Sequence, residues 1–465
     1  MTVRPTSRRL RHWSSFGLVM AITLGTALIL AACAADGDRP VGSSMTGPAV
    51  TPASTVPAVS TETTMPTALP DGIVRTTSGD STGNRFSPGR GDLPDAVPVD
   101  VSLSGTPLWV VGAGTERGST WVVALDDGRL EGWRVENGQP VPVSLNLARL
   151  SAGAPPVVIA GPDGVVVVEP PVGASHDTFP MPLPGGGLVY VTDDGTVVAE
   201  TGDRTHRFEV DALPDTRITI SENGLVAVLA EATTRYPHGA LGDELEAGRV
   251  TIIDPRAGEV VAEAVVAEPA VIEGVAALWA EIDGDGQQEI LITVSDGSSG
   301  ARLAVFDQGG DLVAEGPAIG RANRWRNQLG VAAFGPNGEI EMVDVRVPHI
   351  GGVVEFFRLE NGRLTVHGEQ VGFTSHMFGS RNLDMALAAD ADGDGRIEVV
   401  IPDQAMNALG LLRRTAVGVM VVAKVELPGT LSTNVAAAVH RNGLLSFAAG
   451  TDGGVLRIWP AHESG

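Results

Sequence analysis

Short apolar segments alternate with polar turns from about residue 97 to the end of the chain. Two apolar segments flanking an Asn-Gly or Asp-Gly pair are the strongest short-range signal for a β-hairpin, since both central residues of that turn take positive φ angles. The pattern therefore predicts a series of hairpins, with turns at Asp163-Gly164, Asp194-Gly195, Asn223-Gly224, Asp285-Gly286, Asn337-Gly338, Asp394-Gly395 and Asn442-Gly443.

Many of these units continue into a second hairpin, such as residues 303–306 with 312–315 and residues 353–357 with 364–367. Two hairpins make a four-stranded antiparallel sheet, which cannot bury both faces alone. Radial repetition stacks each sheet against its neighbours and buries them. The pattern predicts an all-β fold, a β-propeller.

The predicted units number eight and begin near residues 107, 155, 187, 217, 275, 328, 383 and 434. The second and third are short, so they are either trimmed blades or one divided blade, and seven blades is the alternative. The last unit has three strands, and residues 97–103 could supply its outer strand and close the ring, which would protect exposed sheet edges. A β-sandwich remains the simpler alternative, although these units outnumber its strands.

The first residues form an export signal. Arg4, Arg8, Arg9 and Arg11 precede an apolar run from Phe16 to Ala32, which ends Leu30-Ala31-Ala32-Cys33. A charged start, an apolar middle and small residues before a cleavage site are typical of secretory signals. The Cys placement resembles the bacterial lipobox, which implies lipid on Cys33 and anchorage to the outer face of the cell membrane. A plain transmembrane anchor and twin-arginine export are the alternatives.

A linker is predicted after the signal, because residues 39–70 contain 6 Pro and 11 Ser or Thr and show no apolar periodicity. Such a composition behaves as a flexible tether. The predicted organisation is a signal peptide at 1–32, a lipid-anchored linker at 33–95 and a propeller at 96–465.

Composition narrows the function. With 32 Lys and Arg against 56 Asp and Glu, the net charge is −24, which argues against nucleic acid as a partner. The single Cys excludes an intramolecular disulfide and a Cys-based zinc site. No HExxH, Gly-x-Ser-x-Gly or phosphate-binding motif is present.

Two turns carry alternating carboxylates. One has Asp390, Asp392, Asp394 and Glu398 at loop positions 1, 3, 5 and 9, and the other has Glu281, Asp283, Asp285 and Glu289. Like charges converging on one point would repel unless a hard cation lay among them, and Ca²⁺ prefers such oxygen ligands. The position-7 carbonyls, of Arg396 and Gln287, could add a ligand.

These two loops resemble the calcium loops of FG-GAP/VCBS repeats, the integrin α-type propeller family. The resemblance implies Ca²⁺ that stabilises the blades, although Glu281 departs from the usual Asp. It also implies that the calcium hairpins lie on one face and that loops between second and third strands, and between blades, lie on the opposite, partner-binding face.

The loops assigned to that opposite face contain unusual residues for so acidic a chain. They are Arg235, His238, Arg324, Trp325, Arg326, Arg346, His349, His376, Phe378 and Arg381. Exposed Trp and Arg are common in binding hot spots, and Arg suits carboxylates or phosphates. The alternative is structural, with Trp325 filling a gap between blades.

The sequence thus predicts an exported, calcium-binding propeller lipoprotein that binds an extracytoplasmic protein or glycan without catalysis. The alternative is a propeller enzyme, either a polysaccharide lyase or hydrolase or a quinoprotein dehydrogenase. The quinoprotein alternative depends on the segment Gly83-Asn-Arg-Phe-Ser-Pro88, which resembles the entry segment of eight-bladed quinoproteins over six residues.

Overall fold

A computed structural model describes residues 72–115, 118–161 and 164–462, and its contacts group residues 64–465 into one compact unit. Within this described part the regular structure consists of strands, and no helix is present. The predicted signal peptide, Cys33 and most of the predicted linker lie outside the described residues. No helix long and apolar enough to span a membrane occurs among the residues described.

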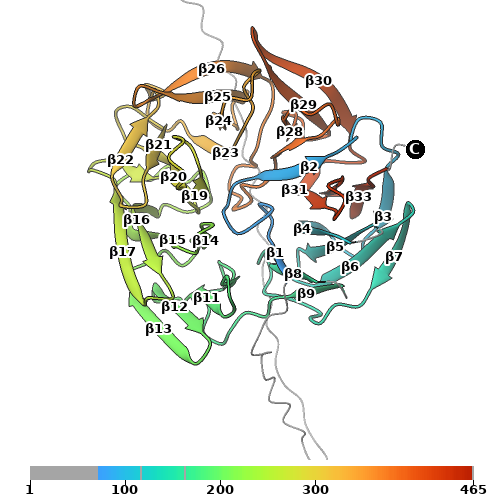
Figure 1. Ribbon diagram of the computed structural model, residues 1–465, viewed down its shortest axis with the longest axis horizontal. Helices are drawn as coiled ribbons and strands as arrows, with labels where there is room; N and C mark the ends of the chain where they lie inside the picture. The colour runs from blue at the N-terminus through green and yellow to red at the C-terminus, as the bar shows by residue number, and fades with distance from the viewer. Residues whose placement is uncertain (1–71, 116–117, 162–163, 463–465) are drawn as a thin grey trace, which may run out of the picture. The chain divides into compact units, whose positions relative to one another are not determined.

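The strands form successive four-stranded antiparallel units arranged around a ring, so the fold is a β-propeller (Figure 1). The units run from the innermost strand outward. The first three, in chain order, are β4 (Pro107–Gly114), β5 (Gly118–Leu125), β6 (Leu130–Glu136) and β7 (Gln139–Val143); β10 (Met181–Pro182), β11 (Leu188–Val191), β12 (Thr196–Thr201) and β13 (Arg204–Glu209); and β14 (Thr219–Ile220), β15 (Val226–Thr233), β16 (Glu246–Asp254) and β17 (Glu259–Val265).

Three further units follow along the chain. They are β19 (Leu278–Ala280), β20 (Glu289–Ser295), β21 (Arg302–Phe306) and β22 (Leu312–Glu315); β23 (Arg326–Ala332), β24 (Glu341–Arg346), β25 (Val353–Glu360) and β26 (Arg363–Val371); and β27 (Leu387–Asp390), β28 (Glu398–Pro402), β29 (Ala408–Thr415) and β30 (Gly418–Glu426). The short strand β18 (Val271–Ile272) pairs with both β16 and β20 and so joins two units.

The ring closes with a strand from the other end of the chain, as predicted. The last unit comprises β31 (Leu431–Val439), β32 (Leu445–Thr451) and β33 (Val455–Trp459). Its fourth strand is β3 (Val99–Ser102), which pairs antiparallel with β33. The first and last parts of the propeller are thereby held in one sheet.

The second predicted unit differs from the others. It is a three-stranded sheet in which the hairpin β8 (Val158–Gly161) and β9 (Gly164–Val167) pairs with the N-terminal strand β1 (Ile73–Arg75). The described residues therefore contain seven four-stranded units and one smaller sheet, so the blade number depends on whether the smaller sheet is counted.

The hairpin turns lie where the Asx-Gly pairs predict, but their backbone differs from the expected type. Among the described predicted turns only the glycines have positive φ, for example Gly195 at 78° and Gly338 at 84°. At four of these turns, those of Asp194, Asp285, Asp394 and Asn442, the side-chain oxygen accepts from the backbone N–H two residues ahead, as Asp194 Oδ1 does from Thr196 at 3.2 Å. Positive φ at both positions occurs at Asn137-Gly138 and Asn361-Gly362, in turns outside the predicted set.

The core lies between neighbouring sheets. Leu229 of β15 and Ile292 of β20 belong to one buried cluster, and Val123 of β5 and Ala448 of β32 to another. Every residue of β20 is buried. This explains why the inner strands read as continuous apolar runs rather than alternating ones.

The N-terminal segment fills the central channel, which corrects the predicted boundary at residue 95/96. Residues 73–90 form β1 and β2 (Phe86–Arg90), drawn in blue at the centre of the ring in Figure 1. Strand β2 pairs parallel with β27. Inner strands donate backbone hydrogen bonds to this segment, from Ile220 to Ser81, Trp279 to Thr82 and Ala388 to Arg85. Extended backbone satisfied in this way needs no apolar periodicity, so composition could not show it.

Candidate functional site

Strand order divides the propeller surface into two faces. Hairpins between first and second strands, including both carboxylate loops, lie on one face, here called the metal-loop face. Connections between second and third strands, and those leading into each innermost strand, lie on the other, here called the cavity face. The loops that carry the predicted rim residues all belong to the cavity face.

The carboxylates of the first loop converge. Between β19 and β20, the side chains of Glu281, Asp283, Asp285 and Glu289 place one oxygen each within 4.8 Å of one another. Glu289 is buried, and burial, reinforced by the nearby Asp283 and Glu281, raises its pKa to about 7. Backbone N–H groups of the loop donate to these oxygens, for example from Gln287 to Asp285 at 2.7 Å.

The second loop is arranged differently, because a guanidinium already lies among its acids. Asp390, Asp392 and Glu398 also converge within 4.8 Å. The nitrogens of Arg413, on β29, contact Asp392 at 2.5 Å, Asp394 at 2.8 Å and Glu398 at 2.6 Å. Arg413 is paired in register with Glu398.

Both carboxylate clusters could therefore hold a metal ion, and they fit one to different degrees. In the second loop, the buried Asp390 Oδ1 has no hydrogen-bond partner, which leaves it free as a ligand. Arg413, however, contacts Asp392, Asp394 and Glu398 and offsets one of their negative charges. The first loop has no such ion pair among the described residues, so its donor set is the better match for a metal cation. The ligand roles of the Arg396 and Gln287 carbonyls stay predictions.

The predicted rim residues are brought onto one face, but several are buried rather than exposed. Trp325 and His376 are 2% and 1% exposed. The loop at 234–245, between β15 and β16, covers them: Ala240 and Leu241 form a small core with Trp325 and Leu383. The expectation of an exposed Trp325 is therefore wrong, because a loop from another blade packs over it, and its Nε1 donates to the Glu273 carbonyl at 3.0 Å.

A histidine pair packs against Trp325. His349 Nε2 lies 2.6 Å from His376 Nδ1, and His376 Nε2 lies 2.6 Å from the Ser380 carbonyl. Since that carbonyl only accepts, His376 carries its proton on Nε2 and accepts the His349 N–H at Nδ1. Burial lowers the pKa of both rings to about 4, with neighbouring histidines adding to the effect.

A second histidine contact lies beneath the same loop. His238 Nδ1 contacts a carboxylate oxygen of Glu273, and the Ser295 hydroxyl donates to the other oxygen. The ring of His238 also packs edge-on against Tyr236, at 5.9 Å between centroids. Glu273 is fully buried, so these contacts satisfy an internal carboxylate.

Most predicted rim arginines are used internally. Arg326 is 3% exposed and bonds Asp344 at 2.9 Å and Glu355 at 2.5 Å, so the expectation that it is an exposed anchor is wrong. Arg346 shares Glu355, and Arg235 donates to the Ala270 carbonyl. Arg324 donates to the Asn323 carbonyl.

Phe378 is the rim aromatic that stays exposed. It is 64% exposed and contacts His349 edge-on, at 5.2 Å between ring centroids. Two other large apolar residues on these loops, Ile350 and Met377, are also exposed. An apolar group of this kind on loops supported by a buried core is typical of an interaction surface.

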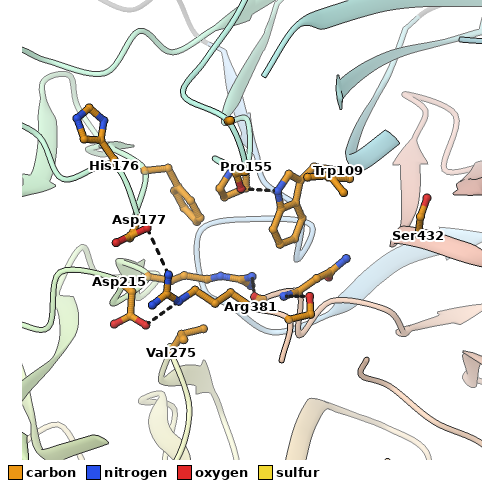
Figure 2. Close-up of a pocket in the computed structure, with 15 residues that line it drawn as sticks. Trp109, Pro155, His176, Asp177, Asp215, Val275, Arg381 and Ser432 are labelled. Atoms are coloured by element: carbon orange, nitrogen blue, oxygen red, sulfur yellow. Dashed lines mark hydrogen bonds and ion pairs between the residues drawn. The ribbon is translucent and has the colours of Figure 1, made fainter. Parts of the chain in front are cut away.

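A cavity of about 320 Å³ opens at the centre of the cavity face, where segments leading into the inner strands meet (Figure 2). Trp109, Pro155, Phe179 and Val275 supply apolar lining, and Trp109 Nε1 donates to the Gly153 carbonyl at 2.8 Å. Its polar lining includes His176, Asp177, Asp215, Arg217, Ser380, Arg381, Asn382 and Ser432.

Arg381 ties the wall of this cavity together. Its guanidinium contacts Asp215 at 3.2 Å, Asp243 at 2.8 Å and Asp177 at 3.3 Å, and Figure 2 shows it reaching toward Asp177 and Asp215. Burial raises the pKa of Asp215, Arg381 opposes the rise, and Asp243 and Asp177 add to it. The three acids come from three different connections, so this arginine links segments far apart in sequence.

The floor of the cavity includes Arg217, which belongs to a buried ion-pair network. Asp384 accepts from Arg217 at 2.6 Å, from Arg85 at 2.7 Å and from the Thr77 hydroxyl at 2.6 Å. Burial alone would raise the pKa of Asp384, but the two guanidiniums and the hydroxyl hold it at about 2. Arg217 also lies over the Trp109 ring, at 5.4 Å.

Sequence reasoning found Arg381 but missed the other cavity residues. Trp109, Phe179, Arg217 and Val275 each lie at or just before the start of an inner strand. That shared position in the repeat is the signal that could have located them, because the inner strands of a propeller converge on its axis.

No family model and no curated protein matches the chain. Solved structures that resemble it include the WD40 domain of Toxoplasma gondii coronin, at 9% identity, covering 80% of this chain and 88% of that one with a TM-score of 0.41. Another is BBS1N in complex with ARL6DN, at 13% identity, 81% and 98% coverage and the same TM-score. The FG-GAP/VCBS resemblance stays a prediction.

Proposed function

We propose that the chain is a non-catalytic binding module, exported and anchored to the outer face of the cell membrane by lipid on Cys33. Its partner, a protein or glycan outside the cytoplasm, binds the cavity face. The observation that carries this proposal is the cavity at the channel mouth, whose wall is held together by Arg381 and its three carboxylates.

The path of the N-terminal segment supports this orientation. Ile73 pairs with Ala160 and Arg75 with Val158, so β1 runs antiparallel to β8 and begins toward the metal-loop face. The described chain thus enters the propeller from the face opposite the cavity, which leaves the cavity face clear for a partner. Exposed Phe378, Met377 and Ile350 then lie on the side available to a partner.

Calcium is the second part of the proposal. We assign the Ca²⁺ site to Glu281, Asp283, Asp285 and Glu289, which would hold the ion, and the ion would neutralise the hairpin between β19 and β20. Its role is to stabilise that blade, because the loop lies on the face opposite the cavity.

The enzymatic alternatives have less support. A glycoside hydrolase uses a pair of carboxyl groups as its acid and its base or nucleophile. The two acids lining the cavity, Asp177 and Asp215, are both bound to Arg381. The segment 83–88 lies in the channel, where Asn84 exchanges hydrogen bonds with the backbone of Val331. This packing explains the segment without quinoprotein chemistry.

Two experiments test the proposal. Cys33→Ala should leave the chain without lipid, so that it no longer partitions into detergent like the wild type; unchanged partitioning would contradict anchorage. Separately, the detergent-solubilised full chain should capture a partner from cell envelope. Phe378→Ser should reduce capture, whereas Asp203→Asn, in the exposed β12–β13 turn of the metal-loop face, should not. Capture reduced only by the second variant would overturn the proposal.

A further inference from the structure

We propose that the cavity of the cavity face recognises an organic cation, the ammonium or guanidinium group of a lysine or arginine side chain on a protein partner. This inference rests on the proposed binding function and gives its ligand chemistry. It also reverses the sequence-based expectation that the arginines of this face would bind a carboxylate or phosphate.

The guanidinium of Arg381 is already paired with acids of this chain. All three of its guanidinium nitrogens already face carboxylates, Nε toward Asp215, Nη1 toward Asp177 and Nη2 toward Asp243. An anionic ligand would have to displace these acids and then lie beside them. Arg381 therefore organises the wall and is not a free fork for an anion.

The wall of the cavity has more acidic than basic groups. One guanidinium faces three carboxyl groups, so the cluster carries a net charge of −2 when all four are ionised. Burial raises the pKa of Asp215, Arg381 opposes the rise, and Asp243 and Asp177 add to it. The single positive charge of Arg381 is shared among three acids, so the cluster lacks further positive charge. A second cation placed beside Asp177 and Asp215 would supply it.

The acids of the wall are accessible to a ligand in the cavity. Asp177, which lines the cavity, has a side chain 54% exposed, and ionised carboxylates only accept hydrogen bonds. The wall therefore presents acceptors to a ligand. On the floor, Arg217 is 9% exposed on its side chain and is committed to Asp384 and to the Arg381 carbonyl, so it limits how deep a cation can enter.

The size and the lining of the cavity fit one long side chain. A cavity of about 320 Å³ can hold one long side chain, and Pro155, Phe179 and Val275 offer apolar surface to its methylene stem. The combination of an apolar lining and acids at one wall matches a lysine or arginine side chain. The net charge of −24 on the chain would also attract a basic partner.

The test uses the full chain in detergent and small probes. Nα-acetyl-lysine methylamide should bind saturably by ligand-observed NMR, about tenfold or more tighter than the uncharged norleucine analogue, and salt should weaken its binding. Asp177→Asn should weaken lysine-probe binding about threefold, as for an exposed ion pair, and Asp215→Asn should weaken it more. Asp203→Asn, on the metal-loop face, should leave binding unchanged. Asp177 is exposed enough that its variant should fold.

The inference is overturned if the lysine probe fails to bind, if the norleucine analogue binds equally well, or if neither Asp variant changes the affinity. Preferential binding of inorganic phosphate or N-acetylglucosamine would replace it with an anion or glycan site. If Phe378→Ser reduces partner capture but the lysine probe does not displace the partner, the cation site is refuted and the binding function stands. If the lysine probe binds saturably but no partner is captured, the cation site stands and the proposed binding function is refuted.

Discussion

Arg413 Nη2 lies 2.5 Å from Asp392 Oδ2, so a guanidinium is placed among the carboxylates of the second acidic loop. The residue at the corresponding position of the first loop carries the opposite charge. Arg413 pairs in register with Glu398, whereas Ile290 pairs with Phe306, which places Asp307 at the position facing Glu289. The loop that carries the usual Asp at its first position is therefore the one whose negative charge is already partly offset by an arginine.

This difference predicts which loop responds to calcium. Ca²⁺ should raise the melting temperature of the full chain, because it binds the native loop better than the unfolded chain. Asp285→Asn should remove most of that rise, and Asp394→Asn should remove little. Arg413→Gln should increase the response, because it frees a second carboxylate set. Equal melting curves in EDTA and in excess Ca²⁺ would refute both sites, and a response lost only with Asp394→Asn would reverse their order.

The N-terminal segment should be part of the folding unit. Asp384 is fully buried and neutralised by Arg85 of that segment and by Arg217, so Asp384→Asn leaves two buried guanidiniums without a counter-charge. Breaking a buried ion pair costs about 3–5 kcal/mol. Asp100→Asn, which breaks the exposed pair with Arg457 on the closing strand, should cost at most about 1 kcal/mol.

Urea unfolding of the two variants compares them directly. Deleting residues 72–95 gives an independent measurement, since it removes the backbone acceptors used by Ile220, Trp279 and Ala388. A deleted chain as stable as the wild type would show that the channel segment is an attachment and not a structural element.

The two rim aromatics should behave in opposite ways. Trp325 is buried beneath the loop at 234–245, so Trp325→Ala should cost about 3–5 kcal/mol of stability through the cavity that it leaves. Phe378 is exposed, so Phe378→Ser should change stability by about 0.5 kcal/mol or less. Thermal melts of both variants, combined with partner capture, separate packing from binding. Reduced capture by Trp325→Ala at unchanged stability would restore the exposed-rim interpretation.

The sequence could predict the parts of this fold that depend on neighbours along the chain. The Asx-Gly turns locate hairpins because the turn residues determine them locally. The three strands of the last unit predict that residues 97–103 supply its fourth strand. The channel segment could not be predicted in this way, since Asn84 bonds Val331 and Arg85 bonds Asp384, hundreds of residues away. No local periodicity records such contacts.

For the candidate site, connectivity correctly placed the rim loops on one face, but it could not determine which side chains are buried. Trp325 and His376 are covered because the loop at 234–245 reaches another blade, where the Gly379 N–H donates to the Ala240 carbonyl. The pairing of Arg381 with its three acids could not be predicted either, because these acids come from three separate connections. The carboxylate loops were predictable because their ligands are consecutive in sequence.

The histidine pair should make the protein acid-sensitive over a defined range. The pKa of His349 and of His376 falls from 6.5 to about 4, because burial disfavours the charged ring. Above pH 6.5 both rings are neutral whether folded or unfolded. Between pH 6.5 and 4 the unfolded chain binds protons that the folded chain excludes, so stability falls as the pH falls, and the loss ends below pH 4.

Carboxyls with raised pKa oppose this trend, since Glu246, with a pKa of about 10, and Asp344, at about 7, take up protons when folded. The comparison must therefore be between wild type and His349→Gln, which keeps an N–H donor for His376 Nδ1 and removes one titrating ring. From pH 6.5 to 4 the wild type should lose about 1–2 kcal/mol more stability than this variant, less than the full shift because His349 is only half-buried. Urea unfolding at several pH values measures the difference. Parallel pH curves would mean that His349 is protonated at no cost in the folded state, and that the contact with His376 does not constrain its charge.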